Sequence, residues 1–257
     1  MCRWLAYWGP PLFLEDLVAK PDHSLIHQSL HAAEAKTETN GDGFGLGWYG
    51  ERPEPGLYRE ILPAWNDENL KHLSAQIRSR LFFAHVRAST GTATTRANCH
   101  PFAYGRWLFM HNGQIGGYGL IRRKLEQMLP DEYYTCRHGT TDSELVFLLA
   151  LSLGLDADPV GAMGESLAIV RRAMAEAGIT DPLRFTAVLS DGNRIFAFRC
   201  ASDALAPTLY YTGAGSAAMT LVSEPLDTDR PRWTAVPQGH VVSVCGSGRL
   251  TTTEFIV

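Results

Sequence analysis

The chain has 257 residues, of which 45% are hydrophobic and 19% are charged, and its formal net charge is −4. This composition is typical of a globular protein with a large core, and the weak negative charge without a lysine–arginine run argues against a nucleic-acid or anionic-membrane surface. The five cysteines form no Cys-x-x-Cys pair, and no apolar run approaches the ~20 residues of a membrane span. We therefore expect a cytoplasmic protein whose partner is a small molecule, with no nucleic acid and no membrane.

The first half of the chain is predicted to be rich in strands. Apolar runs of strand length occur at residues 4–7, 44–49, 81–88 and 107–110, and a glycine-rich turn at 40–43 precedes the second of them. Runs of this kind are typical of strands that are buried on both faces.

Helices are predicted for the middle of the chain, over residues 120–129, 143–153 and 159–177. The second of these follows Thr141 and carries Glu144 three residues later, which is a capping signature. The third has Pro159 in its first turn and Gly178 just past its end, as helix boundaries prefer.

Strands return after residue 184. Two apolar runs flank Asp191-Gly192-Asn193, which is a hairpin signal. Strands followed by helices and then by strands again predict an α+β protein with two mainly antiparallel sheets between helical layers, and we expect one domain over residues 2–257. The strands predicted here are 185–189, 194–199, 209–211, 220–222, 241–244 and 251–256.

Met1 is followed directly by Cys2. Removal of the methionine, which we expect before so small a side chain, leaves one residue with both a thiol and a free α-amine. Because the amine has an ordinary pKa near ~7.7 and the thiol one near ~8.5, the amine can take the thiol proton at neutral pH. Cys2 is therefore a candidate nucleophile, and a chance position or an acylation site are the alternatives.

Polar residues interrupt the apolar strand that ends near residue 88. Arg87 lies there between His85 and Thr90, and an arginine beside a core strand is costly unless an anion answers it. A structural salt bridge would satisfy this need. A planar guanidinium that binds a substrate carboxylate would satisfy it equally well.

Two further polar sites are candidates for catalysis or binding. His111-Asn112-Gly113 ends the next apolar strand, where Asn-Gly is commonly a turn, although its amide and backbone N–H could also bind one oxyanion. Asp142 stands at a predicted helix start, where an acid commonly caps the helix but could also bind a substrate ammonium.

His23, His27 and His31 are spaced four residues apart. On a helix this spacing would place them on one face, where they could hold a metal ion. The alternative is a solvated polar face, because no pair of carboxylates accompanies them. We expect no metal and no cofactor.

Five fragments together resemble the glutaminase domain of class II glutamine amidotransferases, which are N-terminal-nucleophile hydrolases. The resemblance is greatest to the small stand-alone members of that family. It implies a four-layer αββα sandwich. The fragments are Cys2, His85-x-Arg87-x-x-Thr90, Asn98-Cys99-His100-Pro101, His111-Asn112-Gly113 and Thr141-Asp142-Ser143-Glu144.

The resemblance implies a role for each matching residue. The Cys2 thiol would attack the γ-carbonyl of glutamine or of a γ-glutamyl amide, and Asn112 with Gly113 would hold the oxyanion. The α-carboxylate would bind Arg87 with help from Thr90. The α-ammonium would bind Asp142. We assign no role to His85, His100 or His111.

The chain departs from the larger family members at two positions. Ala88 stands where they have tryptophan, and Gly91 where they usually have histidine. Three functions follow from the resemblance: a stand-alone γ-glutamyl amidohydrolase, a glutaminase that delivers ammonia to a separate synthase or acts with a peptidase subunit, and a non-catalytic glutamine-binding regulator. We favour the first.

Overall fold

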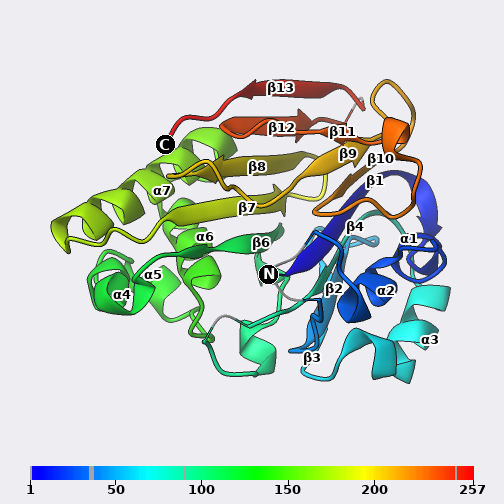
Figure 1. The fold of residues 1–257 in the computed structure, drawn as a ribbon, viewed down its shortest axis with the longest axis horizontal. Helices are drawn as coiled ribbons and strands as arrows, with labels where there is room; N and C mark the ends of the chain where they lie inside the picture. Colours follow the sequence, from blue (N-terminus) through cyan, green and yellow to red (C-terminus); the bar gives the residue numbers. More distant parts are fainter. Residues whose placement is uncertain (1, 35–37, 90, 247) are drawn as a thin grey trace.

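The computed structural model describes residues 2–34, 38–89, 91–246 and 248–257, which form two antiparallel sheets with helices packed against them (Figure 1). The first sheet has the strand order β11-β9-β10-β1-β4-β2-β3. β1 and β4 are neighbours in this sheet and run antiparallel, so the start of the chain lies beside the end of β4. The strands are β1 (Arg3–Phe13), β2 (Phe44–Trp48), β3 (Gly56–Glu60), β4 (Arg78–Val86), β9 (Tyr210–Thr212), β10 (Met219–Val222) and β11 (Thr234–Ala235).

The second sheet has the strand order β13-β12-β8-β7-β6-β5. β7 and β8 form the hairpin predicted at Asp191-Gly192-Asn193, and Asp191 stabilises the turn by accepting the backbone N–H groups of Asn193 and Arg194. The strands are β5 (Phe102–Tyr104), β6 (Trp107–Ile115), β7 (Leu183–Ser190), β8 (Ile195–Ala201), β12 (His240–Val244) and β13 (Leu250–Glu254).

The helices form two outer layers. One layer packs on the first sheet and the other on the second, as the separate apolar clusters on the two outer faces show. The first layer holds α1 (Glu15–Val18), α2 (Leu25–Leu30) and α3 (Glu68–Gln76), and the second holds α4 (Tyr118–Glu126), α5 (Asp131–Tyr134), α6 (Asp142–Ser152) and α7 (Pro159–Glu176). Short 3₁₀ turns occur at Ala64–Asn66, Arg96–Asn98 and Arg230–Arg232.

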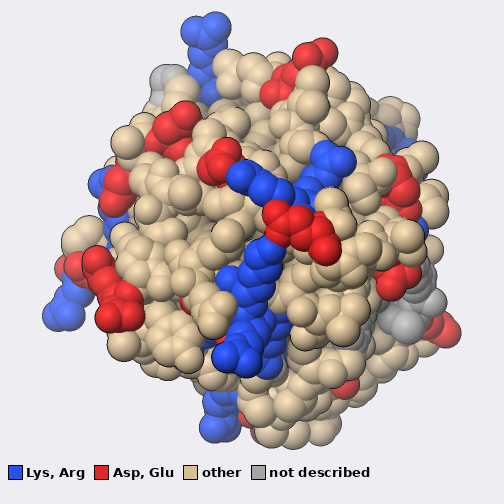
Figure 2. Space-filling view, turned by 90° about the vertical axis from the view of Figure 1, so that its left-hand side faces the viewer, with Lys and Arg blue, Asp and Glu red and all other residues tan. Residues whose placement is uncertain are grey.

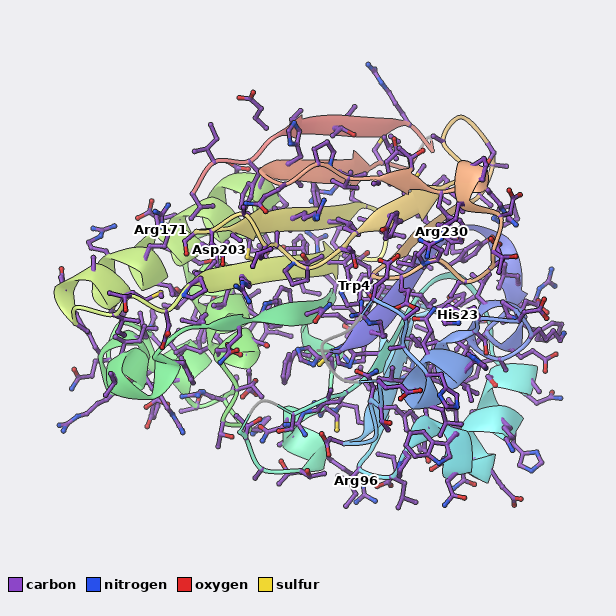
Figure 3. The ribbon with its side chains drawn as sticks, in the orientation of Figure 1. Trp4, His23, Arg96, Arg171, Asp203 and Arg230 are labelled. Carbon is purple, nitrogen blue, oxygen red and sulfur yellow. The ribbon has the colours of Figure 1, made fainter. Side chains whose placement is uncertain are left out.

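A third apolar cluster fills the space between the two sheets. Trp4 and Phe83 contribute to it from the first sheet, and Met110 and Val188 contribute from the second. Figure 3 shows Trp4 near the centre of the molecule, at the start of β1. The α+β prediction of two mainly antiparallel sheets between helical layers is therefore confirmed.

The boundary signals predicted for α6 and α7 are confirmed in physical detail, whereas α4 spans Tyr118–Glu126 rather than the predicted 120–129. Thr141 caps α6 by accepting the N–H of Glu144, and Pro159 occupies the first turn of α7. Gly178 follows α7 with a φ of 65°, and this left-handed backbone lets Ile179 N–H return to the Met174 carbonyl.

One expectation about local structure was wrong, and three helices had no prediction. His111-Asn112-Gly113 neither ends its strand nor forms a turn, because β6 continues to Ile115 and pairs with β7 at all three residues. The three helices of the first layer were not predicted; α1 and α2 are only 4 and 6 residues long, and α3 has 9 residues. None of the helices in the part of the chain that the structure describes is long and apolar enough to cross a membrane.

Candidate active site

Cys2 lies directly before β1, where the strand pairing sets its neighbours. Arg3 pairs with Val86 on β4, so that Cys2 comes opposite the residues that follow this strand. The Cys2 thiol lies 3.6 Å from the Ala88 carbonyl oxygen, toward which it points. The sequence separation of 86 residues is thus closed by one antiparallel ladder.

Strand alternation directs three predicted site residues into one space. Side chains two residues apart share a face of a strand, and Trp4, Phe83 and Met110 all face the space between the sheets. Cys2 has the same parity as Trp4 on β1. Arg87 has the parity of Phe83 just beyond β4, and Asn112 that of Met110 on β6.

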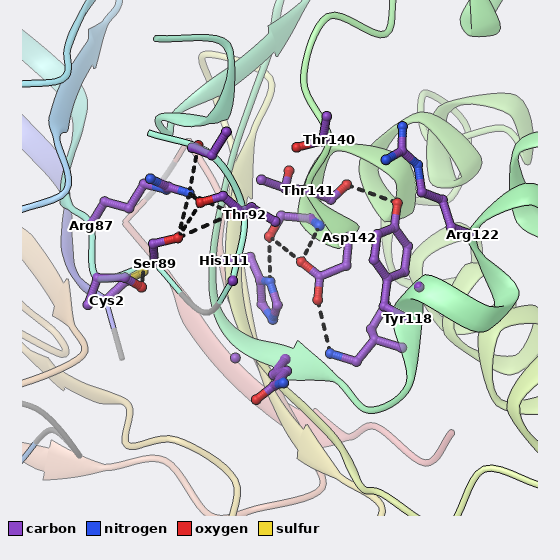
Figure 4. Close-up of a pocket in the computed structure, with 18 of the residues that line it drawn as sticks. Cys2, Arg87, Ser89, Thr92, His111, Tyr118, Arg122, Thr140, Thr141 and Asp142 are labelled. Atoms are coloured by element: carbon purple, nitrogen blue, oxygen red, sulfur yellow. Dashed lines mark hydrogen bonds between the residues drawn. The ribbon is translucent and has the colours of Figure 1, made fainter. Parts of the chain in front are cut away.

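This end of the inter-sheet space opens into a pocket of about 550 Å³ (Figure 4). Cys2, Arg87, Gly113 and Asp142 all line it, so the structure brings together four of the six predicted site residues. The pocket is large enough for a ligand beyond a free amino acid, since pockets for drug-sized ligands begin at ~300 Å³.

The remaining two predicted residues need separate comment. The Asn112 side chain is fully buried and does not line the pocket, although its neighbours His111 and Gly113 do. Thr90 lies outside the described residues.

The Arg87 guanidinium is buried and held by neutral oxygens. Nη1 donates to the Asp42 carbonyl at 3.2 Å, and Nη2 donates to Thr92 Oγ1 at 2.6 Å and to Ser89 Oγ at 3.2 Å. No carboxylate pairs with Arg87 among the residues that the structure places, so a structural salt bridge does not explain it. Because arginine carries five N–H donors, Nε and one Nη1 hydrogen are left for a ligand.

Sequence reasoning did not find the residues that hold Arg87. Asp42 acts twice, because its carboxylate also accepts the Ser89 N–H at 2.7 Å. Asp42 lies in the glycine-rich turn 40–43, which we had interpreted only as a turn before β2. Ser89 and Thr92 carry no motif that would have identified them.

Asn112 and Gly113 lie side by side in β6, opposite Thr186 and Phe185. Neither the Nδ2 nor the Oδ1 atom of Asn112 has a hydrogen-bond partner in the described structure. A buried amide without partners is costly, and such groups in native proteins commonly await a ligand. Gly113 admits no side chain, because a Cβ would overlap the Arg184 carbonyl.

Asp142 is the first residue of α6, directly after the Thr141 cap. One carboxylate oxygen accepts the Ile115 N–H at 2.9 Å, and the other accepts the Ser143 N–H at 2.7 Å. Asp142 therefore fixes the end of β6 to the start of α6, in addition to presenting a negative charge to the pocket (Figure 4).

Three buried histidines lie close together beside the pocket, and two of them, His100 and His111, line it. His85 stacks on His100 with ring centroids 4.3 Å apart, and His111 hydrogen-bonds Ser143 Oγ through Nδ1 at 2.8 Å. Burial lowers the pKa of all three, that of His85 to about 3. They are therefore neutral at pH 7 and weak as bases.

The Cys2 thiol has the opposite shift. Burial raises its pKa, while the positive charges of Arg87 and Arg3 act in the other direction. The thiol is mostly protonated at neutral pH, so a nucleophilic role requires a general base nearby.

The histidine row considered as a metal site does not assemble into one. The ring centroids of His23 and His27 lie 5.3 Å apart, and those of His27 and His31 lie 5.7 Å apart. However, His23 binds the buried Glu224 at 2.5 Å and His31 binds Glu38 at 2.8 Å. Across the described ranges, no group of three histidine, cysteine or acidic side chains is placed to hold a metal ion. Cys2, Cys99, Cys136 and Cys200 form no disulfide.

The surface at the α4 and α7 end carries charges of both signs side by side (Figure 2). Arg122 pairs with Glu126 at 2.7 Å, and Arg184 pairs with Asp203 at 2.6 Å. Figure 3 shows Asp203 and Arg171 on this side of the molecule. The mixture gives this face no continuous positive field for a polyanion.

Known sequences that are similar to this chain belong to proteins of one enzyme family. Residues 17–212 match the family described as glutamine amidotransferases class-II. The chain is 33% identical to the probable glutamine amidotransferase DUG3 of Saccharomyces cerevisiae, over 95% of this chain and 82% of that protein. It is 32% identical to the gamma-glutamyl-hercynylcysteine sulfoxide hydrolase of Mycolicibacterium smegmatis, over 95% and 96%.

Solved structures share the fold. A glutamine aminotransferase class-II domain protein from Silicibacter pomeroyi is 38% identical and superposes with a TM-score of 0.79, over 99% of this chain and 100% of that one. Glutamine phosphoribosylpyrophosphate amidotransferase from B. subtilis is 13% identical with a TM-score of 0.65, over 99% of this chain and 49% of that one. The second likeness shows the fold alone.

Proposed function

The chain belongs to the class II glutamine amidotransferases, and we propose that it is a stand-alone hydrolase of the γ-amide of glutamine or of a γ-glutamyl amide or peptide. The observation that carries the proposal is the pocket in which Cys2, Arg87, Gly113 and Asp142 meet. A nucleophile, a cation, an oxyanion donor and an anion are together the groups that this reaction requires.

Two opposite charges in the pocket match the head group of an amino acid. The free donors of Arg87 bind the substrate α-carboxylate, and Asp142 binds its α-ammonium. Thr90 assists at the carboxylate. A substrate held in this way presents its side-chain amide to Cys2, which explains why a γ-amide rather than a peptide bond is cleaved.

The reaction proceeds through a thioester. The Cys2 sulfur attacks the γ-carbonyl carbon, and the C–N bond then breaks as the leaving nitrogen takes a proton. Water next attacks the γ-glutamyl thioester, which releases glutamate and restores the thiol. The Asn112 amide and the Gly113 N–H stabilise the oxyanion of both tetrahedral intermediates.

The α-amine of Cys2 is the base that removes the thiol proton, once Met1 has been cleaved off. The raised thiol pKa calls for a base, and burial makes His85, His100 and His111 poor ones. An α-amine with an ordinary pKa near ~7.7 suits the task at neutral pH. The resulting ammonium then supplies the proton to the leaving nitrogen.

A hydrolase that acts alone is favoured over a glutaminase that feeds a synthase or acts with a peptidase subunit. The Mycolicibacterium relative, which is named a hydrolase, is covered over 96% of its length. Residues 2–257 then form one glutamine amidotransferase domain, since the late strand β10 completes the first sheet beside β1. Its place is the cytoplasm, where thiols such as those of Cys99 and Cys200 stay reduced.

Covalent labelling of Cys2 tests this function. Intact mass should show loss of Met1 and one adduct of 6-diazo-5-oxonorleucine, a reactive glutamine mimic, mapped to Cys2. Cys2→Ala, or a tag left in front of Cys2, should abolish both the adduct and glutamate release from glutamine, glutathione and other γ-glutamyl compounds. Cys136→Ala is the matched control and should retain both. Turnover by Cys2→Ala would refute the proposal.

A further inference from the structure

Asn98 lies between the two segments that carry the charged groups of the pocket. It ends the 3₁₀ turn Arg96–Asn98 and is 1% exposed. Its Nδ2 atom donates to the Ala93 carbonyl at 2.8 Å and to Thr140 Oγ1 at 3.1 Å, and its Oδ1 atom accepts the Thr140 N–H at 2.7 Å. One amide thus joins the segment after Arg87 to the segment before α6.

On one side the connection reaches Arg87. The Ala93 carbonyl that accepts from Asn98 also accepts from Arg87 Nη2 at 3.4 Å, and the adjacent Thr92 hydroxyl binds the same nitrogen at 2.6 Å. A shift of Ala93 would therefore move the oxygens that orient the guanidinium.

On the other side the connection reaches Asp142. Thr140 directly precedes the Thr141 cap and the first residue of α6. Gly139 lies so near that a Cβ there would be 2.6 Å from Asn98 Oδ1, and its N–H donates to Glu144 at 2.7 Å. The backbone before α6 is consequently held from two directions.

We propose that Asn98 is a positioning residue that sets the separation between Arg87 and Asp142, and thereby selects substrates with a carboxylate and an ammonium on the same carbon. The inference rests on the proposed function of those two residues. A buried, fully bonded amide is a rigid spacer, and a site preorganised in this way loses less entropy when it binds.

Two variants of Asn98 separate positioning from general stability. Asn98→Asp keeps an oxygen for the Thr140 N–H but replaces the donor to Ala93 and Thr140 Oγ1 with a second oxygen, and Asn98→Ala removes all three bonds. Each should raise KM for glutamine about tenfold or more, since a buried hydrogen bond is lost. Preference for glutamine over glutaramate, the same amide without the ammonium, should fall as well.

Alkylation of Cys2 by two reagents distinguishes a positioning role of Asn98 from a purely structural one. Labelling by 6-diazo-5-oxonorleucine, which carries the head group, should slow by the same factor as glutamine turnover. Labelling of Cys2 by iodoacetamide, which has none, should be unchanged. The matched control is Ser79→Ala, which loses buried bonds to Tyr49 and Leu81 at the far end of β4 and should leave KM at its wild-type value.

Wild-type KM and selectivity in Asn98→Asp would overturn the proposal, whether or not Asn98→Ala folds. Equal slowing of both labelling reactions, or the same KM shift in Ser79→Ala, would also overturn it, because the loss would then be general. A wild-type protein that neither cleaves glutamine nor labels at Cys2 would instead refute the proposed function, and this inference with it.

Discussion

Two residues of the proposed site, Asn112 and Cys2, are buried in ways that do not favour the stability of the fold. The Asn112 amide is fully buried without a partner in the described structure, and the Cys2 thiol is held protonated by burial. An unpaired buried amide costs about 1–3 kcal/mol. A residue of this kind is explained by a ligand that completes its bonds, here the oxyanion of the proposed reaction.

Asn112→Ala should therefore separate catalysis from stability. We expect kcat for glutamine to fall about a hundred- to a thousandfold, because one oxyanion donor is lost. The free energy of unfolding should change by less than about 1 kcal/mol, because no hydrogen bond of the folded protein is broken and the relief of the unpaired amide offsets the cavity that its removal leaves.

Urea unfolding and steady-state kinetics would measure both effects. The matched control is Asn40→Ala, because Asn40 is equally buried but donates to the Gln28 carbonyl at 3.2 Å, and its loss should be destabilising. A large loss of stability in Asn112→Ala would show that the amide is structural.

At the level of elements, the start of α6 is the most consequential boundary. The helix begins with the Thr141 cap, and its first residue, Asp142, also holds the Ile115 N–H at the end of β6. One helix start thus fixes the Asp142 carboxylate relative to β6, the strand that carries Asn112 and Gly113. The cap of α7 at Asp158 is chemically similar but lies away from the pocket residues.

Thr141→Val and Asp158→Ala form a matched pair. Each removes a side-chain oxygen that accepts a backbone N–H, at 3.2 Å and 2.9 Å respectively, and each should cost about 1 kcal/mol of unfolding free energy. Only Thr141→Val should raise KM for γ-glutamyl substrates, because only α6 carries Asp142. Equal kinetics in the two variants would contradict this role of the α6 cap.

On the scale of the whole molecule, the meeting of two sheets creates both the pocket and a pH-sensitive interior. His85 bridges the inter-sheet space, with Nε2 lying 3.4 Å from the His111 carbonyl. Burial lowers the pKa of His85 from 6.5 to about 3, and it lowers those of His100 and His111 as well. The folded protein therefore excludes protons that the unfolded chain accepts.

Acid should destabilise the fold well above the range in which carboxylates titrate. Below pH 6.5 the unfolded chain binds protons at these histidines while the folded state does not, until pH approaches 3 at His85. This contribution to stability is fully present above pH 6.5 and is lost on acidification, by about 1.4 kcal/mol per pH unit for His85, and the lowered pKa values of His100 and His111 act in the same direction. Urea unfolding at pH 7.5, 6.5 and 5.5 would measure the slope, and a flat profile would be inconsistent with neutral buried histidines.

Sequence patterns predicted the elements that are long and strongly apolar. α6, α7 and the central strands were found because their periodicity and caps are local signals. α1 and α2 were not found, since helices of 4 and 6 residues owe their existence to packing on the first sheet. β6 was ended too early, because Asn-Gly favours a turn locally and only pairing with β7 overrides it.

The sequence by itself determined the chemistry that is available: a thiol beside the first amine, an arginine and an aspartate of opposite charge, and an amide next to a glycine. Strand alternation, which is also in the sequence, settled which side chains share a face. Only the tertiary structure decided that these groups meet, because Cys2 reaches Ala88 across 86 residues through the β1–β4 pairing. It also decided that neutral oxygens of Asp42, Ser89 and Thr92 orient Arg87 and that Asn98 joins the segment after Arg87 to the segment before Asp142, since contacts between distant segments leave no periodic trace in a chain.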